Sequence, residues 1–306
     1  MKVGIIGGTG FVGGHLADGL LQAGHELSLL VRQGSASKLR RPGQVRAVEG
    51  DLSSSDALRD VVEGCDAVIY NVGILREFPR RGITYEASQY RGAADTVSAA
   101  LDAGVKRFLL MSANGVKQPG TPYQETKHRA EEFALQSGLD VTVMRPSVIF
   151  GDPLGTMEFA TQLYRDMIRP PLPAVGFFAG GDPEKGAIVM SPVHIDDVVA
   201  AFVEALADAA TIGKTFELGG PEILTWRDMI TRIAQATGKN KWILPMPTRI
   251  MRIGAALFDW LPFFPVTRDQ LTMLEEGNTA DPSILRQLIG REPKPFSADN
   301  LRYLGG

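Results

Sequence analysis

Short apolar runs alternate with amphipathic stretches through the first half of the chain. The apolar, β-branched runs predict strands at residues 2–7, 25–32, 45–51, 67–73, 107–113 and 141–151. Between them, apolar residues recur at helical spacing over 11–24, 55–64, 93–104 and 126–138. Each of these stretches ends on a glycine, the residue that commonly closes a helix: Gly24, Gly64, Gly104 and Gly138. Apolar strands separated by helices indicate an α/β fold with a doubly wound parallel sheet, the Rossmann arrangement.

The regularity loosens after residue 150. Residues 170–186 are rich in proline and glycine and predict loops. Further on, the pattern predicts helices over 191–208 and 225–238 and a strand over 213–220. We therefore expect a dinucleotide-binding domain and a smaller C-terminal substrate or cap domain. The first comprises residues 1–150 plus about 187–220, and the second 151–186 and 221–306.

Composition narrows the functional class. The chain has 306 residues, of which 44% are hydrophobic and 22% charged, as in ordinary soluble globular proteins. A net charge of −3 gives no reason to expect nucleic acid as a partner. Cys65 is the single cysteine and the four histidines are scattered, so we predict neither a disulfide nor a metal site. The N-terminus lacks a signal-peptide pattern and no window is apolar enough to span a bilayer, which predicts a cytoplasmic protein.

The segment IIGGTGFVGGHL predicts a phosphate-binding loop. Gly7, Gly10 and Gly13 follow the first strand and open the first helix. Glycines allow the tight turn, the close approach of a pyrophosphate and the contact of helix with strand, while the helix N-terminus supplies amide donors. We expect the residues between them to contact the same group: Thr9, Phe11 and Val12.

The end of the second strand bears on the choice of cofactor. NAD-binding loops usually carry an acidic residue there, whereas this chain has Arg32, whose guanidinium suits a 2′-phosphate. We therefore expect NADP(H), with NAD(H) as the alternative. Lys38, Arg40 and Arg41, further along, are expected to form a solvated basic loop. The ends of the third and fourth strands are expected to face the adenine and the middle of the dinucleotide, respectively, through Asp51 and Leu52 and through Asn71, Val72 and Gly73.

Tyr123 and Lys127 stand one helical turn apart and share a face. Spacing alone leaves two interpretations open: a proton-handling pair, or two polar residues on an amphipathic helix. The wider pattern resembles the short-chain dehydrogenase/reductase superfamily, in its extended and atypical branches. The resemblance rests on the glycine loop, GDL at 50–52, the Tyr-x-x-x-Lys pair, RPSVIFG at 145–151 and VHIDDVV at 193–199. The C-terminal half, with GGPEILTWRDMI and PFSADNLRYLG, is similar to proteins like the nucleotide-binding accessory subunit of respiratory complex I.

This resemblance implies roles for individual residues. Tyr123 would be the general acid/base of a carbonyl/alcohol exchange, with Lys127 lowering its pKa and holding the nicotinamide ribose. Ser112 would polarise the carbonyl, and the cofactor contacts would extend to Pro146, Ser147 and Val148. The chain departs from the family pattern where it has Ala113 in place of the catalytic hydroxyl and Gln89 in place of an asparagine.

Two segments outside these motifs are candidates for contact with other molecules. Residues 249–265 predict an amphipathic helix that either packs over the substrate pocket or docks on a partner protein or a membrane surface. Residues 74–90 predict a lid or substrate loop. Two functions remain: an NADP(H)-dependent oxidoreductase that moves a hydride to or from a carbonyl or alcohol, and an accessory or assembly protein of a larger complex that binds NADP(H) without turnover.

Overall fold

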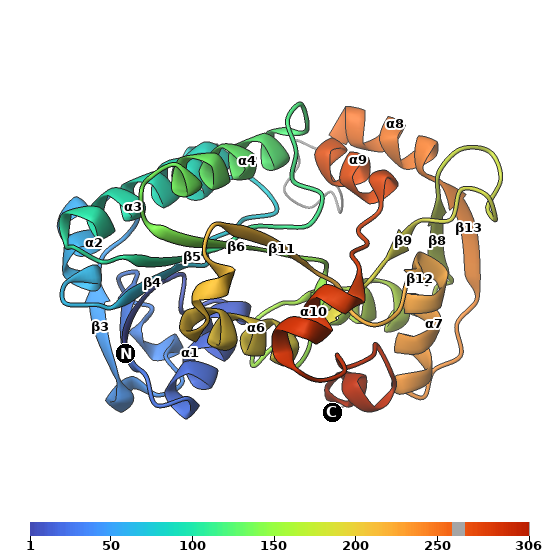
Figure 1. The fold of residues 1–306 in the computed structure, drawn as a ribbon. Helices are drawn as coiled ribbons and strands as arrows, with labels where there is room; N and C mark the ends of the chain where they lie inside the picture. The colour runs from blue at the N-terminus through green and yellow to red at the C-terminus, as the bar shows by residue number, and fades with distance from the viewer. Residues whose placement is uncertain (259–266, 306) are drawn as a thin grey trace. The chain divides into compact units, whose positions relative to one another are not determined.

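The computed structural model describes residues 1–258 and 267–305. The chain folds into two compact units (Figure 1). The first unit comprises Met1–Pro146, Asp196–Glu217 and Gln287–Ile289, and the second comprises Ser147–Ile195, Leu218–Arg286 and Gly290–Gly306.

The first unit is built on a seven-stranded sheet in the order β11-β6-β5-β4-β1-β2-β3. Its strands are β1 (Lys2–Ile6), β2 (Glu26–Val31), β3 (Val45–Glu49), β4 (Ala67–Tyr70), β5 (Arg107–Met111), β6 (Asp140–Pro146) and β11 (Lys214–Leu218). Strands β1 to β6 pair in parallel. The order of the strands changes direction at β1, because β2 and β3 lie on one side of it and β4 to β6 on the other. Dinucleotides bind at such a switch point between β1 and β4. The predicted doubly wound α/β fold is confirmed.

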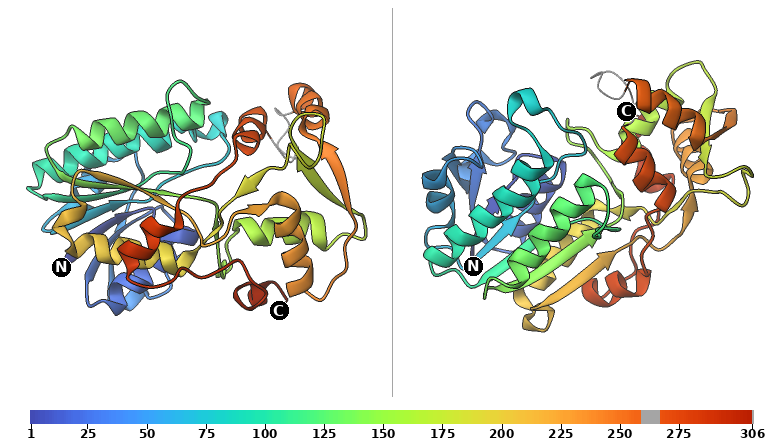
Figure 2. Two further views of the ribbon diagram at one scale, coloured as in Figure 1. Left: turned by 45° about the vertical axis from the view of Figure 1, so that its right-hand side comes forward. Right: turned by 90° about the horizontal axis from the view of Figure 1, so that it is seen from above.

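Helices cover both faces of this sheet, as the views in Figures 1 and 2 show. One face carries α2 (Ser55–Val62), α3 (Gly92–Asp102) and α4 (Pro122–Leu135), and the other carries α1 (Phe11–Gln22) and α6 (Ile195–Ala207). Under the first group lies a core that includes Leu58, Val97 and Phe108, all at most 2% exposed. On the other side α1 packs closely on α6, because a Cβ at Gly19 would lie 2.2 Å from Val199.

Several predicted boundaries shift. Helix α4 begins at Pro122 instead of residue 126, because Thr121 forms a capping box with Gln124. The strand predicted over 141–151 breaks after Pro146, and β7 (Ile149–Phe150) pairs instead with β10 (Val193–His194). The end of the segment predicted as a loop over 74–90 is helical, since the π-helix η4 (Glu86–Arg91) leads directly into α3. By contrast, the four helix-ending glycines have positive φ, as predicted.

The second unit contains short strand pairs and helices around its own core. Two of its strands, β8 (Ala174–Phe178) and β13 (Ile243–Pro247), run parallel, and β9 (Val189–Met190) pairs antiparallel with β12 (Leu224–Thr225). The helical elements are α5 (Phe159–Leu163), η5 (Tyr164–Ile168), α7 (Trp226–Ala236), α8 (Thr248–Phe258), α9 (Arg268–Glu276), η7 (Asp299–Gly305) and the greater part of α10 (Pro282–Ile289), whose end at Gln287–Ile289 belongs to the first unit. The core gathers Trp226, Ile230 and Phe296. Within the described ranges, no helix combines the length and the apolar character needed to cross a membrane.

Candidate cofactor and active site

The glycine loop joins β1 to α1, and two of its glycines are required by the fold itself. Gly7 has a φ of +95°, and a Cβ there would lie 2.5 Å from the Asn71 carbonyl oxygen. A Cβ on Gly13 would lie 2.1 Å from the Gly7 carbonyl oxygen, so the helix can approach the strand only with glycine at this position. Gly10 differs, since the nearest atom to its Cβ would be 3.8 Å away. The space beside the Gly10 α-carbon is therefore open, and a ligand can approach the backbone there.

The start of α1 fits a phosphate group. Gly10 is the N-cap residue, and no side chain among the described residues caps the helix. The first amide groups of a helix have no partner within it, and they carry the positive end of the helix dipole. Phe11 and Val12 form the first turn, Thr9 stands in the preceding loop, and all three are partly exposed. This geometry suits a pyrophosphate, and its contact with Thr9, Phe11 and Val12 stays a prediction.

The residues predicted at the adenosine end follow β2 and β3. Arg32 is exposed directly after β2. Hydrogen bonds from Ser53 lower the pKa of Asp51, and the charge of Arg32 adds a smaller effect in the same direction. Leu52 packs against the core at the edge of the sheet. Lys38, Arg40 and Arg41 are all exposed, as predicted for a solvated basic loop, and Arg40 and Arg41 also pair with Asp18 on α1. The sequence did not predict the pairing with Asp18, which appears there only as one acidic residue of a helix.

The residues after β4 lie next to both the glycine loop and the lysine. The Asn71 side chain donates to the Gly7 carbonyl at 3.5 Å. A Cβ at Gly73 would lie 3.6 Å from the Nζ of Lys127. Val72 lines a small pocket together with Gln89, Ser112 and Lys127. The first unit thus places the predicted middle-of-cofactor residues next to predicted catalytic ones.

Tyr123 and Lys127 are both buried on the first two turns of α4, at 9% and 6% exposure. This burial contradicts an exposed tyrosine on an amphipathic helix, whereas the proton-handling role of the pair stays a prediction. The Lys127 Nζ donates to the Met111 carbonyl at 3.3 Å and lies 5.8 Å from the centre of the Tyr123 ring. The Tyr85 ring packs edge-on against Tyr123, with 5.7 Å between ring centres.

Burial sets the electrostatics of this pair. It raises the pKa of Tyr123 above its ordinary value, and the neighbouring Tyr85 adds to the rise. Burial also lowers the pKa of Lys127 to about 8, against the opposing effect of Glu131. The lowered tyrosine pKa expected from the family is thus not found in the protein alone, because removal from water disfavours the charged phenolate.

Ser112 lies at the end of β5, where a carbonyl-polarising hydroxyl is expected. It is 5% exposed, and its Oγ has no hydrogen-bond partner among the described residues. Its backbone N–H donates to the Met144 carbonyl at 2.7 Å, which continues the pairing of β5 with β6. A buried hydroxyl without a hydrogen-bond partner in the described structure is uncommon, and Ser112 shares a small pocket with Lys127.

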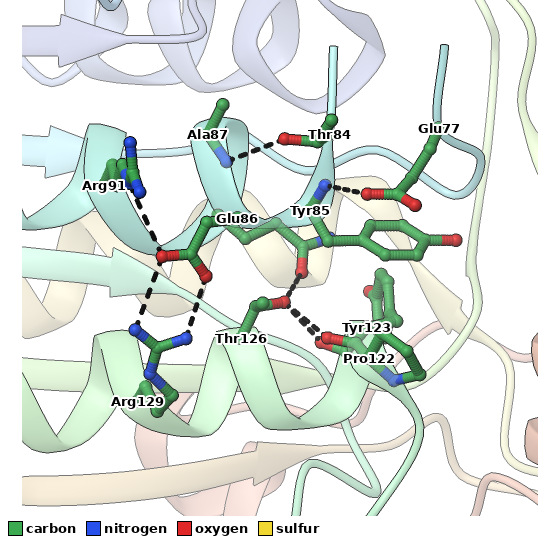
Figure 3. A network of polar contacts seen from close by, with 11 residues as sticks. Glu77, Thr84, Tyr85, Glu86, Ala87, Arg91, Pro122, Tyr123, Thr126 and Arg129 are labelled. Carbon is green, nitrogen blue, oxygen red and sulfur yellow. Dashed lines mark hydrogen bonds and ion pairs between the residues drawn. The ribbon is translucent and has the colours of Figure 1, made fainter. Parts of the chain in front are cut away.

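A polar network that the sequence did not reveal supports the tyrosine (Figure 3). The Thr126 hydroxyl donates to Gln89 Oε1 at 2.8 Å, and Gln89 Nε2 donates to the Ile74 carbonyl at 3.1 Å. Glu86 on η4 forms ion pairs with Arg129 on α4 and with Arg91. These contacts join η4 to α4 beside Tyr123. The signal that could have indicated these contacts is the burial of Gln89. The sequence does not reveal this burial, because the π-helix η4 does not follow the spacing of an α-helix.

The remaining predicted contacts lie at or beyond the unit boundary. Pro146 ends β6 in the first unit, whereas Ser147 and Val148 belong to the second. There the Ser147 hydroxyl donates to the Asn278 carbonyl at 3.0 Å, and the Val148 amide donates to Asn278 Oδ1 at 3.0 Å. Of the segment 249–265, residues up to 258 form part of α8, on which Ile250 and Ile253 are exposed; the rest lies outside the described residues.

Comparisons with known proteins identify the family of the chain. The sequence model of the family described as NAD(P)H-binding matches residues 7–165. Subunit 9 of the NADH dehydrogenase [ubiquinone] 1 alpha subcomplex of Arabidopsis thaliana is 27% identical over 289 residues, covering 90% of this chain and 68% of that protein. Ceramide reductase of Caulobacter vibrioides is 26% identical over 266 residues, covering 84% of this chain and 78% of that enzyme.

Solved structures show the same fold. The UDP-glucuronic acid 4-epimerase from Bacillus cereus, in complex with UDP-glucuronic acid and NAD, matches with a TM-score of 0.73 at 18% identity. The match covers 100% of this chain and 98% of the epimerase chain. The chain belongs to the NAD(P)H-binding family, and its likeness to the extended short-chain dehydrogenases/reductases and to the complex I accessory subunit, predicted from its motifs, is confirmed.

Proposed function

We propose that this protein is an NADP(H)-dependent reductase that transfers a hydride to a carbonyl, with Tyr123 as the proton donor. The observation that carries the proposal is the burial of Tyr123 and Lys127 beside the pocket that holds Ser112, in the same unit as the glycine loop. The cofactor supplies the hydride, and the chain supplies a proton and a polarising hydroxyl.

The protonation state of Tyr123 fits its proposed role as proton donor. Because burial raises this pKa, the phenol keeps its proton at neutral pH and can give it to the oxygen of a carbonyl that is being reduced. Lys127, with a pKa of about 8, remains mostly charged at neutral pH and is available to hold hydroxyl groups of the cofactor ribose. Ser112 Oγ, buried and without a partner in the described structure, would donate to the same carbonyl.

The preference for NADP(H) rests on Arg32. It is exposed at the end of β2, whereas Arg40 and Arg41 are engaged with Asp18. We therefore assign to Arg32 the pairing with the 2′-phosphate of NADP(H). NAD(H) has a hydroxyl group at this position and cannot form such a charged pair. Reversing its charge in Arg32→Glu should therefore weaken NADPH binding far more than NADH binding.

A second function, an accessory subunit that binds NADP(H) without turnover, is supported by Gln89. Its amide is occupied on both sides, by Thr126 and by the Ile74 carbonyl, so it serves the structure. Ala113 supplies no hydroxyl where the family has one. The similarity to a complex I subunit points the same way and suggests a protein complex as the partner, through α8.

One experiment separates the two functions. Protein loaded with NADPH is mixed with a panel of ketones, quinones and enones and with fractionated cell extract, and oxidation is followed by the loss of NADPH absorbance. A reductase oxidises its NADPH, and Tyr123→Phe loses at least about a hundredfold in rate, the usual contribution of a general acid, with nearly unchanged affinity. NADPH that is bound tightly and oxidised by no fraction would refute the reductase. A Tyr123→Phe variant that turns over as the wild type would remove the tyrosine from the mechanism.

A further inference from the structure

The second unit carries an apolar, positively charged hollow that the cofactor site does not use. Strands β8 and β13 start side by side, because the Ala174 amide donates to the Trp242 carbonyl at 2.8 Å (Figure 1). The two loops before these strands line a hollow of about 470 Å³ that is open to solvent. One loop contributes residues 168–173 and the other 239–242.

This hollow is built by specific contacts. The Lys241 Nζ donates to the Leu172 carbonyl at 2.6 Å and also to the Pro170 carbonyl, so it ties one loop to the other. The first loop contains prolines at 170, 171 and 173, which restrict its backbone. The Lys239 ammonium lies 5.5 Å from the centre of the Tyr164 ring. The two loops are therefore held in one arrangement before any ligand arrives.

The surface at this hollow exposes side chains that soluble proteins usually cover. Trp242 is 79% exposed, Leu172 is 69% exposed and Leu244, on β13, is 54% exposed. Arg169, Lys239 and Lys241 line the hollow, and none of its described lining residues is acidic. This local positive charge stands on a chain whose net charge is −3. An exposed tryptophan and leucine among basic residues suit the boundary between lipid headgroups and acyl chains.

We propose that this hollow, formed by residues 168–173 and 239–242, binds the surface of an anionic lipid bilayer. The basic residues meet the headgroups, and Trp242 and Leu172 enter the interface. The proposal does not depend on the reaction at Tyr123. It also differs from contact through α8, because the exposed Ile250 and Ile253 do not line the hollow.

The test is flotation of the full chain with vesicles of phosphatidylcholine alone or mixed with phosphatidylglycerol, at low and high salt. We expect binding to the mixed vesicles only, weakened by salt. Trp242→Glu should lose at least tenfold in affinity, and Arg169→Gln about fivefold, the effect of one basic residue near an anionic surface. Ile223→Glu is the matched control, since Ile223 is 63% exposed in the same unit but outside the hollow, and it should bind as the wild type.

Three results would overturn the proposal. The first is a wild type that does not bind the mixed vesicles, as expected if an acidic protein occupies the hollow. The second is equal loss in Trp242→Glu and Ile223→Glu. The third is loss in Ile253→Glu with none in Trp242→Glu, which would move the contact to α8. As a second measurement, brominated lipids should quench the tryptophan fluorescence of the wild type, and Trp242→Phe should reduce this quenching.

Discussion

Gly10 and Gly13 provide a matched test of the phosphate loop, because the structure assigns them different tasks. A Cβ at Gly13 would lie 2.1 Å from the Gly7 carbonyl oxygen and 2.7 Å from the Gly8 α-carbon, both closer than the 3.0 Å that a Cβ keeps from other heavy atoms. Both obstacles are backbone atoms, so no side chain can move aside. A Cβ at Gly10 meets nothing within 3.8 Å, and its backbone is extended, with φ −83° and ψ 178°.

The two alanine variants should therefore separate stability from binding. Overpacking usually costs about 1–3 kcal/mol, and rigid neighbours place Gly13→Ala near the upper end, about 3 kcal/mol. For a domain of this size that corresponds to a fall in Tm of about 6–12 °C. Gly10→Ala should change the free energy of unfolding by less than about 1 kcal/mol. Its methyl group instead occupies the space through which a pyrophosphate approaches, so the Kd for NADPH should rise at least tenfold, about 1.4 kcal/mol.

Thermal unfolding followed by circular dichroism gives the stability of both variants, and fluorescence titration with NADPH gives their affinity. Gly8→Ala is a useful companion, because its Cβ would meet the Leu29 side chain, which can move. If Gly13→Ala unfolds at the temperature of the wild type, the close approach of α1 to β1 is not a constraint. If Gly10→Ala binds NADPH unchanged, the dinucleotide does not lie against the N-terminus of α1.

The remaining predictions concern α4. Lys127 has a pKa of about 8 in the folded protein against 10.5 for a lysine in water, so above pH 8 the unfolded chain holds one more proton and stability rises with pH. Relative to Lys127→Met, the wild type should gain about 2 kcal/mol in urea unfolding between about pH 8 and pH 9.5; a constant difference would mean that the lysine keeps its proton on folding. Thr126→Val leaves the buried Gln89 Oε1 without its donor and should cost about 1–3 kcal/mol. Arg129→Met removes a partly exposed ion pair and should lower the free energy of unfolding by less than about 1 kcal/mol. Equal losses of stability in Thr126→Val and Arg129→Met would contradict the importance of burial.

The sheet, most of its helices and the phosphate loop were predictable from the order of residues. The inner parallel strands are buried on both faces, so β1 and β4 appear as apolar runs, and the helix-ending glycines mark the turns that follow the helices. The loop was predictable because local geometry requires its glycines: Gly7 has a positive φ, and Gly13 lies where α1 contacts the end of β1. These features involve residues that are close together in the sequence, so the sequence is enough to predict them.

The state of the groups in the site, by contrast, follows only from how the chain packs in three dimensions. Tyr123 has a raised pKa because burial removes it from water and because Tyr85 lies beside it, which no spacing of residues reveals. Asp18 holds Arg40 and Arg41 from a distant part of the chain, and Gln89 finds its partner on another helix. Burial and pairing of this kind depend on how elements far apart in the sequence pack together, whereas the periodicity of a segment reports only which of its faces is apolar.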